Sequence, residues 1–320
     1  MQLRPLGQTG LQVAPIVFGG NVFGWTADEK RSFELLDAFV DAGFNAIDTA
    51  DVYSRWVPGH HGGESETLIG RWLRANPARR QQVLLLTKVG SDMGDEHKGL
   101  GRLWIERAVE DSLTRLNTDV IDLYQSHRPD PETSYEETLG TYDRLVKAGK
   151  IRAIGCSNFD ARQLAEAQHS AQINALPAYQ TLQPEYNLFD RASYDGPLRD
   201  LALQLGLGVI PYYSLASGFL TGKYRTDGDL GKSPRGNGIK KYMTPRGMRI
   251  LAALDQVAQR HGTQPAVVAL AWLIAREGVT APIASATSVA QLANFSAAAE
   301  LALSTSDRAQ LDQASAPEDA

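Results

Sequence analysis

The composition of the chain is that of an ordinary folded protein with a mildly acidic surface. Its 320 residues are 43% hydrophobic and 22% charged, which provides enough apolar material for a large core and excludes a disordered chain. The 32 basic and 37 acidic residues give a formal net charge of -5. This balance gives no general attraction to nucleic acid or to an anionic membrane surface, so we expect neither as a partner.

No stretch of the sequence has the length and apolarity of a membrane span. The strongly apolar windows at residues 264–274 and 83–87 are shorter than the about 20 residues that a spanning helix needs. The first seven residues (MQLRPLG) contain no apolar secretion segment, and Cys156 is the only cysteine. We therefore expect a reducing, cytoplasmic location.

The predicted elements begin with a hairpin and continue as strands that alternate with helices. Residues 1–6 and 11–13 flank a glycine-bearing turn and predict a β-hairpin. Short apolar runs, each typical of a buried strand, follow along the chain. They are residues 16–18, 45–48, 83–88, 120–126, 151–157, 179–183, 209–212 and 280–283.

Helical periodicity fills the intervals between these strands. Helices are expected at residues 28–42, 64–74, 103–116, 135–148, 160–170, 192–205, 265–276 and 289–299, and two more, 245–261 and 306–314, have no following strand. The alternation predicts an α/β fold, a single (β/α)8 TIM barrel with an N-terminal β-hairpin and two extra helices. We expect one domain over residues 1–320, a flexible tail after about residue 312, and a long loop at 227–241.

Four polar residues are expected to meet at the mouth of this barrel, where the strands end. Asp48 ends the second predicted strand and Lys88 the third, His127 follows the fourth, and Tyr53 lies in the loop after Asp48. Asp48 has an alternative role as a cap of the next turn, Tyr53 as a surface aromatic, and His127 as a structural histidine. Lys88 is harder to explain in this way, because a buried ammonium needs a carboxylate partner.

Together the four side chains fit a proton-transfer unit. A tyrosine hydroxyl has an ordinary pKa of about 10, and a neighbouring ammonium lowers it. We therefore expect Lys88 to lower the pKa of Tyr53, and Asp48 to hold Lys88 by a salt bridge. His127 would then hydrogen-bond the oxygen of a carbonyl substrate.

Three patterns around these residues resemble those of the aldo-keto reductases. Residues 43–53 (GFNAIDTADVY) with 63–66 (GESE), Lys88, and residues 124–127 (YQSH) are similar to that family's catalytic segments, and the likeness covers essentially the whole chain. The resemblance implies a catalytic tetrad of Asp48, Tyr53 as general acid, Lys88 and His127. It implies NAD(P)H-dependent reduction of a small aldehyde or ketone to an alcohol.

The resemblance also implies where a nicotinamide nucleotide binds. The sequence has no Gly-x-Gly-x-x-Gly between a strand and a helix, which excludes the Rossmann type of site, and members of the family bind the nucleotide extended. The implied contacts are Gly20 and Asn21, then Ser157, Asn158 and Gln183 at the carboxamide, Tyr213 against the nicotinamide ring, Ser214, Leu215, Ser217, Leu220, Gly222 and Lys223 at the pyrophosphate, and Ser285, Thr287 and Gln291 at the adenosine.

The choice between the two nicotinamide nucleotides rests on the adenosine end. The family favours NADP(H), with NAD(H) as the alternative. Members that bind a 2′-phosphate usually place a lysine or arginine in this segment, whereas residues 283–291 (IASATSVAQ) offer hydroxyl and amide side chains. Hydroxyls at a helix N-terminus can hold phosphate, but without a local cation we expect only modest discrimination.

The substrate is expected to lie against Trp25, Trp56 and Val57 and beside the loop at 227–241. No metal site is expected, because His60 and His61 have no further ligand at a suitable spacing.

Two other functions stay open. One is a Schiff-base aldolase with Lys88 as nucleophile, which would leave the cofactor contacts unexplained. The other is a cofactor-binding regulatory or redox-sensing subunit with incidental turnover. The oligomeric state is left unpredicted.

Overall fold

A parallel sheet forms the centre of the molecule. The computed structural model describes residues 1–94, 97–232 and 238–317. Its eight-stranded sheet has the order β10-β3-β4-β5-β6-β7-β8-β9, with every neighbouring pair parallel. The strands are β3 (Val17–Gly19), β4 (Ala46–Asp48), β5 (Leu84–Val89), β6 (Ile121–Ser126), β7 (Ile151–Ser157), β8 (Thr181–Gln183), β9 (Gly208–Val209) and β10 (Ile283–Ala284).

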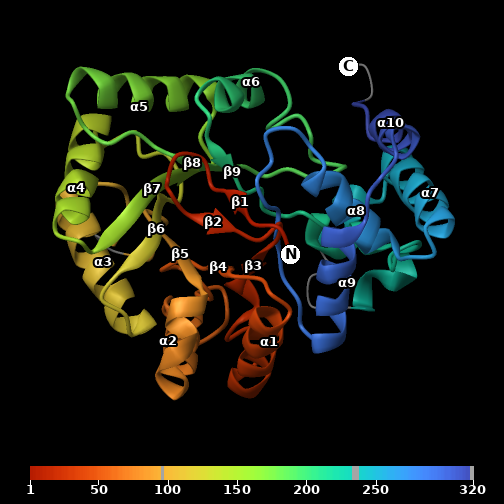
Figure 1. The fold of residues 1–320 in the computed structure, drawn as a ribbon, viewed down its shortest axis with the longest axis horizontal. Helices are drawn as coiled ribbons and strands as arrows, with labels where there is room; N and C mark the ends of the chain where they lie inside the picture. The colour runs from red at the N-terminus through yellow and green to blue at the C-terminus, as the bar shows by residue number, and fades with distance from the viewer. Residues whose placement is uncertain (95–96, 233–237, 318–320) are drawn as a thin grey trace.

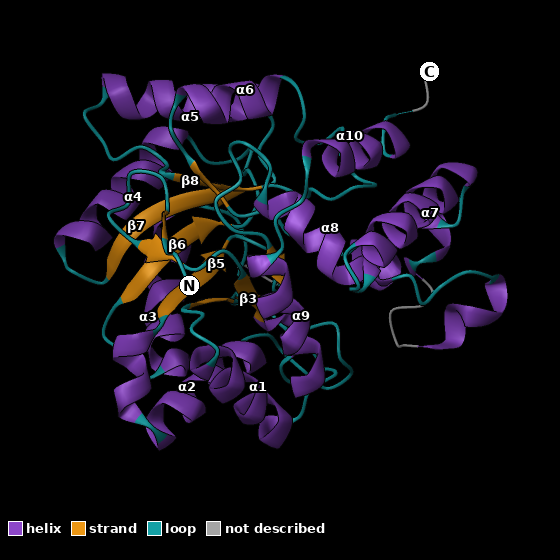
Figure 2. Cartoon of the chain, turned by 45° about the vertical axis from the view of Figure 1, so that its right-hand side comes forward, coloured by secondary structure: helices purple, strands orange, loops and turns teal. Residues whose placement is uncertain are grey.

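The two edges of this sheet meet, which closes it into a barrel. The amide of Thr280 donates to the carbonyl of Val209 at 2.8 Å, and the amide of Ile283 donates to that of Pro211 at 2.8 Å. Val209 and Val279 also pair as an isolated parallel bridge. The predicted (β/α)8 barrel is confirmed, and Figure 2 shows the strands enclosed by helices.

A two-stranded hairpin covers the end of the barrel at which the strands begin. It consists of β1 (Arg4–Pro5) and β2 (Gln12–Val13), which are antiparallel and lie in front of the sheet in Figure 1. Leu6 and Val13 are fully buried with the apolar side chains of the barrel interior. Gly7 has a φ of 55°, and a Cβ there would lie 2.4 Å from the amide nitrogen of Gly208. Only glycine allows this close approach.

The helices surround the sheet much as their periodicity predicts. Asp28 caps the first helix by accepting a hydrogen bond from the Arg31 amide at 2.8 Å, and Gly43 follows its end with a φ of 89°. The helices are α1 (Glu29–Asp41), α2 (Glu64–Ala75), α3 (Arg102–Leu116), α4 (Tyr135–Lys147), α5 (Ala161–Ile173), α6 (Pro197–Gln204), α7 (Pro245–Arg260), α8 (Pro265–Ile274), α9 (Val289–Glu300) and α10 (Thr305–Ala314).

Several boundaries differ from the prediction. The helix expected from residue 192 begins at Pro197, because Gly196 has a φ of 98° and a ψ of -139°, which no helix contains. Short 3-10 helices that the periodicity did not indicate include η1 (Gly20–Val22), η2 (Pro77–Gln82) and η3 (Ala216–Thr221). The loop expected at 227–241 contains η4 (Asp227–Lys232) and the start of η6 (Lys240–Tyr242), and its residues 233–237 lie outside the described residues.

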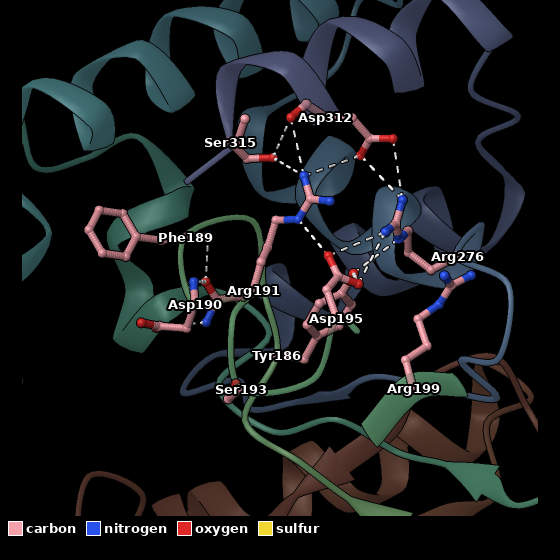
Figure 3. Close-up of polar contacts among 12 residues, drawn as sticks. Tyr186, Phe189, Asp190, Arg191, Ser193, Asp195, Arg199, Arg276, Asp312 and Ser315 are labelled. Carbon is pink, nitrogen blue, oxygen red and sulfur yellow. Dashed lines mark hydrogen bonds and ion pairs between the residues drawn. The ribbon is translucent and has the colours of Figure 1, made fainter. Parts of the chain in front are cut away.

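An ion-pair network anchors the C-terminal helix α10 to the barrel. Figure 3 shows Arg191 and Arg276 pointing toward Asp195 and Asp312. Arg191 lies 2.8 Å from Asp195, and Arg276 lies 3.3 Å from both Asp195 and Asp312. Arg191 also donates to the hydroxyl of Ser315 at 2.9 Å, and Ser315 is fully buried. The packed part of the chain therefore extends at least to Ser315, past the expected start of a flexible tail.

Among the described residues, no helix is both long enough and apolar enough to cross a membrane.

The contact between α2 and α3 gives a test of this packing. A Cβ at Gly70 would lie 1.9 Å from the backbone oxygen of Arg115, so Gly70→Ala should destabilise the fold by about 1–3 kcal/mol. Gly140 in α4 is the matched control, because its Cβ would have only the end of the Arg144 side chain nearby, at 4.0 Å. Gly140→Ala should stabilise by about 0.5–1 kcal/mol. Urea unfolding gives the free energy of unfolding of each variant. Equal changes in the two variants would contradict the close contact between α2 and α3.

Candidate active site

Three neighbouring strands change from apolar to polar at the same level of the barrel. The interior apolar cluster contains Ala46, Leu86 and Leu123. Two residues further along the same strands lie Asp48, Lys88 and Gln125, all buried. Because side chains alternate along a strand with a period of two, these polar residues face the barrel interior as well. The apolar interior is therefore covered by a buried polar layer where the strands end.

The ammonium of Lys88 is at the centre of this layer. The side chain is 0% exposed, and its Nζ donates to Asp48 Oδ2 at 2.7 Å, to the carbonyl oxygen of Thr49 at 2.7 Å and to the hydroxyl of Tyr53 at 3.3 Å. An ammonium has three N–H groups, so all of them are used. The predicted salt bridge to Asp48 is confirmed.

The electrostatics keep Lys88 charged. Burial lowers the pKa of Lys88, but the nearby Asp48 carboxylate and the hydrogen bonds outweigh it, and the pKa ends above its ordinary value. Asp48 also accepts hydrogen bonds through its other oxygen, from Gln183 at 2.9 Å and Gln125 at 3.4 Å. Removal of one partner of a buried ion pair costs about 3–5 kcal/mol, so the fold depends on this pair.

The acidity of Tyr53 differs from the prediction. Burial raises the pKa of Tyr53 above its ordinary value, and the Lys88 ammonium offsets only part of this rise while Asp48 adds to it. Lys88 lowers the pKa of Tyr53, as predicted, but burial outweighs this effect and the net pKa lies above its ordinary value. Loss of water around the hydroxyl outweighs one ammonium that is itself paired with a carboxylate. Tyr53 is protonated at neutral pH.

The imidazole of His127 faces the ring of Tyr53. The two ring centres are 5.9 Å apart and the planes are inclined at 71°. Burial, with the charges of Lys88 and Arg128, lowers the pKa of His127 well below its ordinary value, so the imidazole is neutral at pH 7. Its Nδ1 is buried and has no hydrogen-bond partner among the described residues.

A hydrogen-bonded wall continues from His127 around the mouth. The side-chain amide of Asn158 donates to the carbonyl of His127 at 2.8 Å, and its oxygen accepts from the hydroxyl of Tyr212 at 2.7 Å. Ser157, one residue earlier, donates to the carbonyl oxygen of Gln183 at 2.7 Å. The structure thus brings the three residues expected at the carboxamide, Ser157, Asn158 and Gln183, to the same side of the tetrad.

The residues expected at the other strand ends also converge. Ser285 donates to the carbonyl of Gly19 at 2.8 Å and to Asn21 Oδ1 at 2.7 Å, which joins the end of β10 to η1. A Cβ at Gly20 would lie 3.0 Å from the carbonyl oxygen of Asp48. Gly20 and Asn21 therefore lie between the tetrad and Ser285.

The segment after β9 has an unusual backbone. Tyr213, Ala216 and Ser217 have φ values of 55°, 47° and 57°, a conformation that non-glycine residues adopt rarely and chiefly at functional sites. Ser214 is buried and donates to the carbonyl of Ile283 at 2.7 Å. Leu215 and Ser217 are partly exposed, and Leu220 is buried. Tyr213 as a residue is 46% exposed.

The ammonium of Lys223 lies close to the segment after β9. Its Nζ lies 5.1 Å from the ring centre of Tyr224, and a Cβ at Gly218 would lie 3.9 Å from the same Nζ. Gly222, with a φ of 78°, makes the turn between them. An ammonium beside a loop of strained backbone is a suitable place for a phosphate group.

The adenosine end is the most exposed part of the candidate site. Thr287 and Gln291 are both exposed, and the Thr287 amide donates to the side-chain oxygen of Gln291 at 2.8 Å. Ser288 precedes α9, but its side chain makes no capping hydrogen bond. The sequence from Ile283 to Glu300 contains no lysine or arginine.

Aromatic side chains surround the hydroxyl end of the tetrad. Tyr53 and Trp56 have ring centres 5.6 Å apart, and Trp25 and Trp56 are 5.7 Å apart. Trp56 is 47% exposed, and Val57 is partly exposed beside it. The three residues expected to contact the substrate therefore lie in one cluster with Tyr53.

A second buried polar cluster lies behind the loop that carries Tyr53. Glu66 is 0% exposed, accepts from Thr87 at 2.6 Å and pairs with Arg115 at 2.7 Å. Asp51 is 1% exposed, and neither carboxylate oxygen has a hydrogen-bond partner among the described residues. Burial and the neighbouring Glu66 raise the pKa of Asp51 well above its ordinary value. A cavity of about 100 Å³ borders Asp51 and Arg115 and contains no residue of the tetrad.

The sequence analysis missed two contributors to the site. Gln125 contacts Asp48, and the alternation after Leu123 could have identified it as facing inward. Asn187 is buried and donates to the carbonyl of Tyr213 at 3.1 Å, which supports the left-handed turn there. It lies in an irregular segment after β8, where no periodicity predicts the direction of a side chain.

The chain is similar to known proteins over most of its length. The model of the Aldo/keto reductase family matches residues 15–316. The protein named Uncharacterized oxidoreductase YrpG, from Bacillus subtilis (strain 168), is 34% identical over 95% of this chain and 92% of its own length. Aldo-keto reductase YhdN from the same organism is 32% identical over 98% of this chain and 93% of its own.

A relative with a different name is about as similar. The protein named Probable voltage-gated potassium channel subunit beta, from Oryza sativa subsp. japonica, is 33% identical over 91% of this chain and 89% of its own length. The match of the family model and the near-complete coverage of relatives above 30% identity lead to one conclusion. The chain belongs to the aldo/keto reductase family.

Proposed function

We propose that the chain is an oxidoreductase that reduces aldehydes or ketones to alcohols, with a nicotinamide nucleotide as hydride donor and Tyr53 as general acid. The carbonyl carbon receives the hydride, the carbonyl oxygen receives the proton of Tyr53, and solvent returns a proton to the phenolate. A general acid of this kind contributes about 10²–10⁴-fold to a rate. The observation that carries the proposal is the set of hydrogen bonds around Lys88.

These hydrogen bonds orient the proton of Tyr53. Lys88 donates to the Tyr53 oxygen at 3.3 Å, so the hydroxyl hydrogen is left to point away from Lys88. As the proton leaves, the ammonium stabilises the phenolate that forms. The raised pKa of Tyr53 keeps the group protonated until a substrate oxygen accepts the proton.

His127 would position the carbonyl oxygen rather than supply the proton. Its pKa is lowered by burial and by nearby cations, so at neutral pH it has one N–H donor and one acceptor nitrogen. A neutral imidazole beside Tyr53 would donate one hydrogen bond to the same oxygen and fix its direction.

The aldolase alternative conflicts with the state of Lys88. A Schiff base requires a neutral amine with a free lone pair. The three N–H groups of Lys88 are all donated, and its pKa is raised. Formation of a Schiff base would break all three hydrogen bonds and leave the Asp48 carboxylate buried without its partner.

The residues around the tetrad fit a nicotinamide nucleotide. When bound, it supplies the hydride. Ser157, Asn158 and Gln183 offer amide and hydroxyl groups for a carboxamide, and the ring of Tyr213 offers a stacking surface. The strained loop 213–222 with Lys223 would hold the pyrophosphate, and Ser285, Thr287 and Gln291 the adenosine.

Three finer predictions, the first from the family resemblance and the others from composition, remain as predictions. They are NADP(H) as the preferred nucleotide, a location in the cytoplasm, and no nucleic-acid or membrane partner. The aromatic cluster of Trp25, Trp56 and Tyr53 favours carbonyl compounds with an apolar face.

Removal of one hydroxyl tests the proposal. Tyr53→Phe should lower the rate of carbonyl reduction by about 10²–10⁴-fold and leave the dissociation constant of NADPH nearly unchanged, because the ring stays in place. Tyr135→Phe is the matched control, since Tyr135 lies on α4 outside the site and should keep full activity. Absorbance at the NADPH band with a panel of aldehydes gives the rates. A Tyr53→Phe enzyme with wild-type turnover would assign the acid to another group.

A cofactor-binding regulatory subunit is the second candidate, favoured by the similarity to a protein named as a channel subunit. The same assay separates the two functions. A catalyst turns over aldehydes many times per molecule, whereas a sensor would bind NADPH and show no more than slow turnover in all variants. The complete tetrad with its buried ion pair favours the catalyst.

The adenosine end yields a prediction on cofactor choice. Wild-type protein should prefer NADPH over NADH only modestly, because no cation lies in the segment 283–291. Thr287→Arg should raise this preference by roughly 10- to 100-fold, the effect of one charge-assisted contact. Thr287→Gln is the uncharged control. The test measures the dissociation constants of NADPH and NADH at fixed salt for all three proteins. A wild type that already prefers NADPH by several orders of magnitude would contradict the prediction, because a cation elsewhere, such as Lys223, would then reach the phosphate.

A further inference from the structure

An exposed arginine directly follows the candidate catalytic histidine in the sequence. Arg128 directly follows His127 and is exposed. Within the described ranges 1–94, 97–232 and 238–317, its guanidinium makes no hydrogen bond or ion pair with another residue. The closest carboxylate along the chain, Asp130, accepts instead from the amides of Leu100 and Glu132 and from the hydroxyl of Thr133.

The backbone fixes this arginine at the mouth of the site. The amide of His127 donates to the carbonyl of Val89 at 2.8 Å, and the His127 carbonyl accepts from Asn158 at 2.8 Å. Asn158 in turn holds the hydroxyl of Tyr212 at 2.7 Å. Arg128 therefore extends from a wall of three connected residues that borders the place where a substrate meets His127.

The charge of Arg128 acts on two residues of that wall. It helps to lower the pKa of His127, after burial and Lys88, and it also acts on the hydroxyl of Tyr212. Burial and the carboxyl group of Glu185 raise the pKa of Tyr212, and Arg128 acts in the opposite direction. Glu185 forms no ion pair with Arg128, and burial and Asp190 raise its pKa. Among the described residues, the guanidinium thus has no counterion near the mouth.

We propose that Arg128 makes the site selective for carbonyl compounds that carry a carboxylate group remote from the carbonyl. This inference rests on the proposed reduction of carbonyls by the same site. A guanidinium presents two parallel N–H groups that match the two oxygens of a carboxylate. With the carbonyl oxygen between Tyr53 and His127 and the body of the substrate against Trp56, the carboxylate would lie on Arg128.

The test compares two aldehydes of nearly equal shape, 4-carboxybenzaldehyde and 4-carbamoylbenzaldehyde, which differ in charge at one end. The quantity measured is kcat/KM for the carboxylate divided by kcat/KM for the carboxamide. Relative to wild type, this ratio should fall by about 10- to 100-fold in Arg128→Gln, mainly because KM for the carboxylate rises. Arg128→Lys, which keeps the charge but loses the fork, should give an intermediate ratio. Added salt should lower the wild-type ratio.

Arg162→Gln on α5 is the matched control, because Arg162 is an exposed arginine that has a counterion, Glu166. It should leave the ratio unchanged. A ratio that Arg128→Gln also leaves unchanged, with both aldehydes still reduced, would overturn this inference and leave the proposed function intact. If Arg128→Gln instead lowers the affinity for NADPH and leaves the ratio unchanged, Arg128 binds the cofactor, and this result would also overturn the inference. If wild type reduces other aldehydes of the panel but neither of these two, the inference alone fails. If it reduces no aldehyde with either nucleotide, the proposed function fails, and the inference with it.

Discussion

The candidate site depends on one buried cation, the ammonium of Lys88. It is fully buried and donates its three hydrogens to Asp48, to the carbonyl of Thr49 and to Tyr53. A charge in that position is stable only when every donor is satisfied. The arrangement therefore fixes the end of β4, the start of the following loop and the hydroxyl of Tyr53 together. Asp48 extends the network to Gln125 and Gln183 on β6 and β8, so four strand ends are connected through one ion pair.

Much of this was predictable because the period of two along a strand determines which side chains meet. Ala46 and Asp48 lie two residues apart, as do Leu86 and Lys88, so the change from apolar to polar occurs at one level of the barrel. The barrel itself followed from the alternation of short apolar runs with helical segments. The start of α6 was wrong by five residues because Gly196 and Pro197 override the periodicity of the preceding residues, and the structured ends of the loop at 227–241 carry no periodicity.

Other features of the site depend on distances that a sequence does not contain. The sign of the pKa shift of Tyr53 is the balance of burial, Lys88 and Asp48, and only their positions decide it. The support that Asn187 gives to the turn at Tyr213 joins residues far apart along the chain. The same holds for the surroundings of Arg128. Asp130 lies only two residues away in the sequence, but its oxygens accept from Leu100 and Thr133.

The central claim is that a protonated Tyr53, and not a protonated His127, delivers the proton. Its most direct test is the pH dependence of hydride transfer in a single turnover, with bound NADPH and its 4-deuterated form to confirm that the chemical step is observed. The pKa of Tyr53 is raised and that of His127 is lowered. The rate should therefore stay level from pH 6 to about 10, the ordinary tyrosine value, and fall only above it. A rate that instead falls steadily over this range, by about tenfold per pH unit, is what a protonated His127 with its lowered pKa would give, and it would contradict the account.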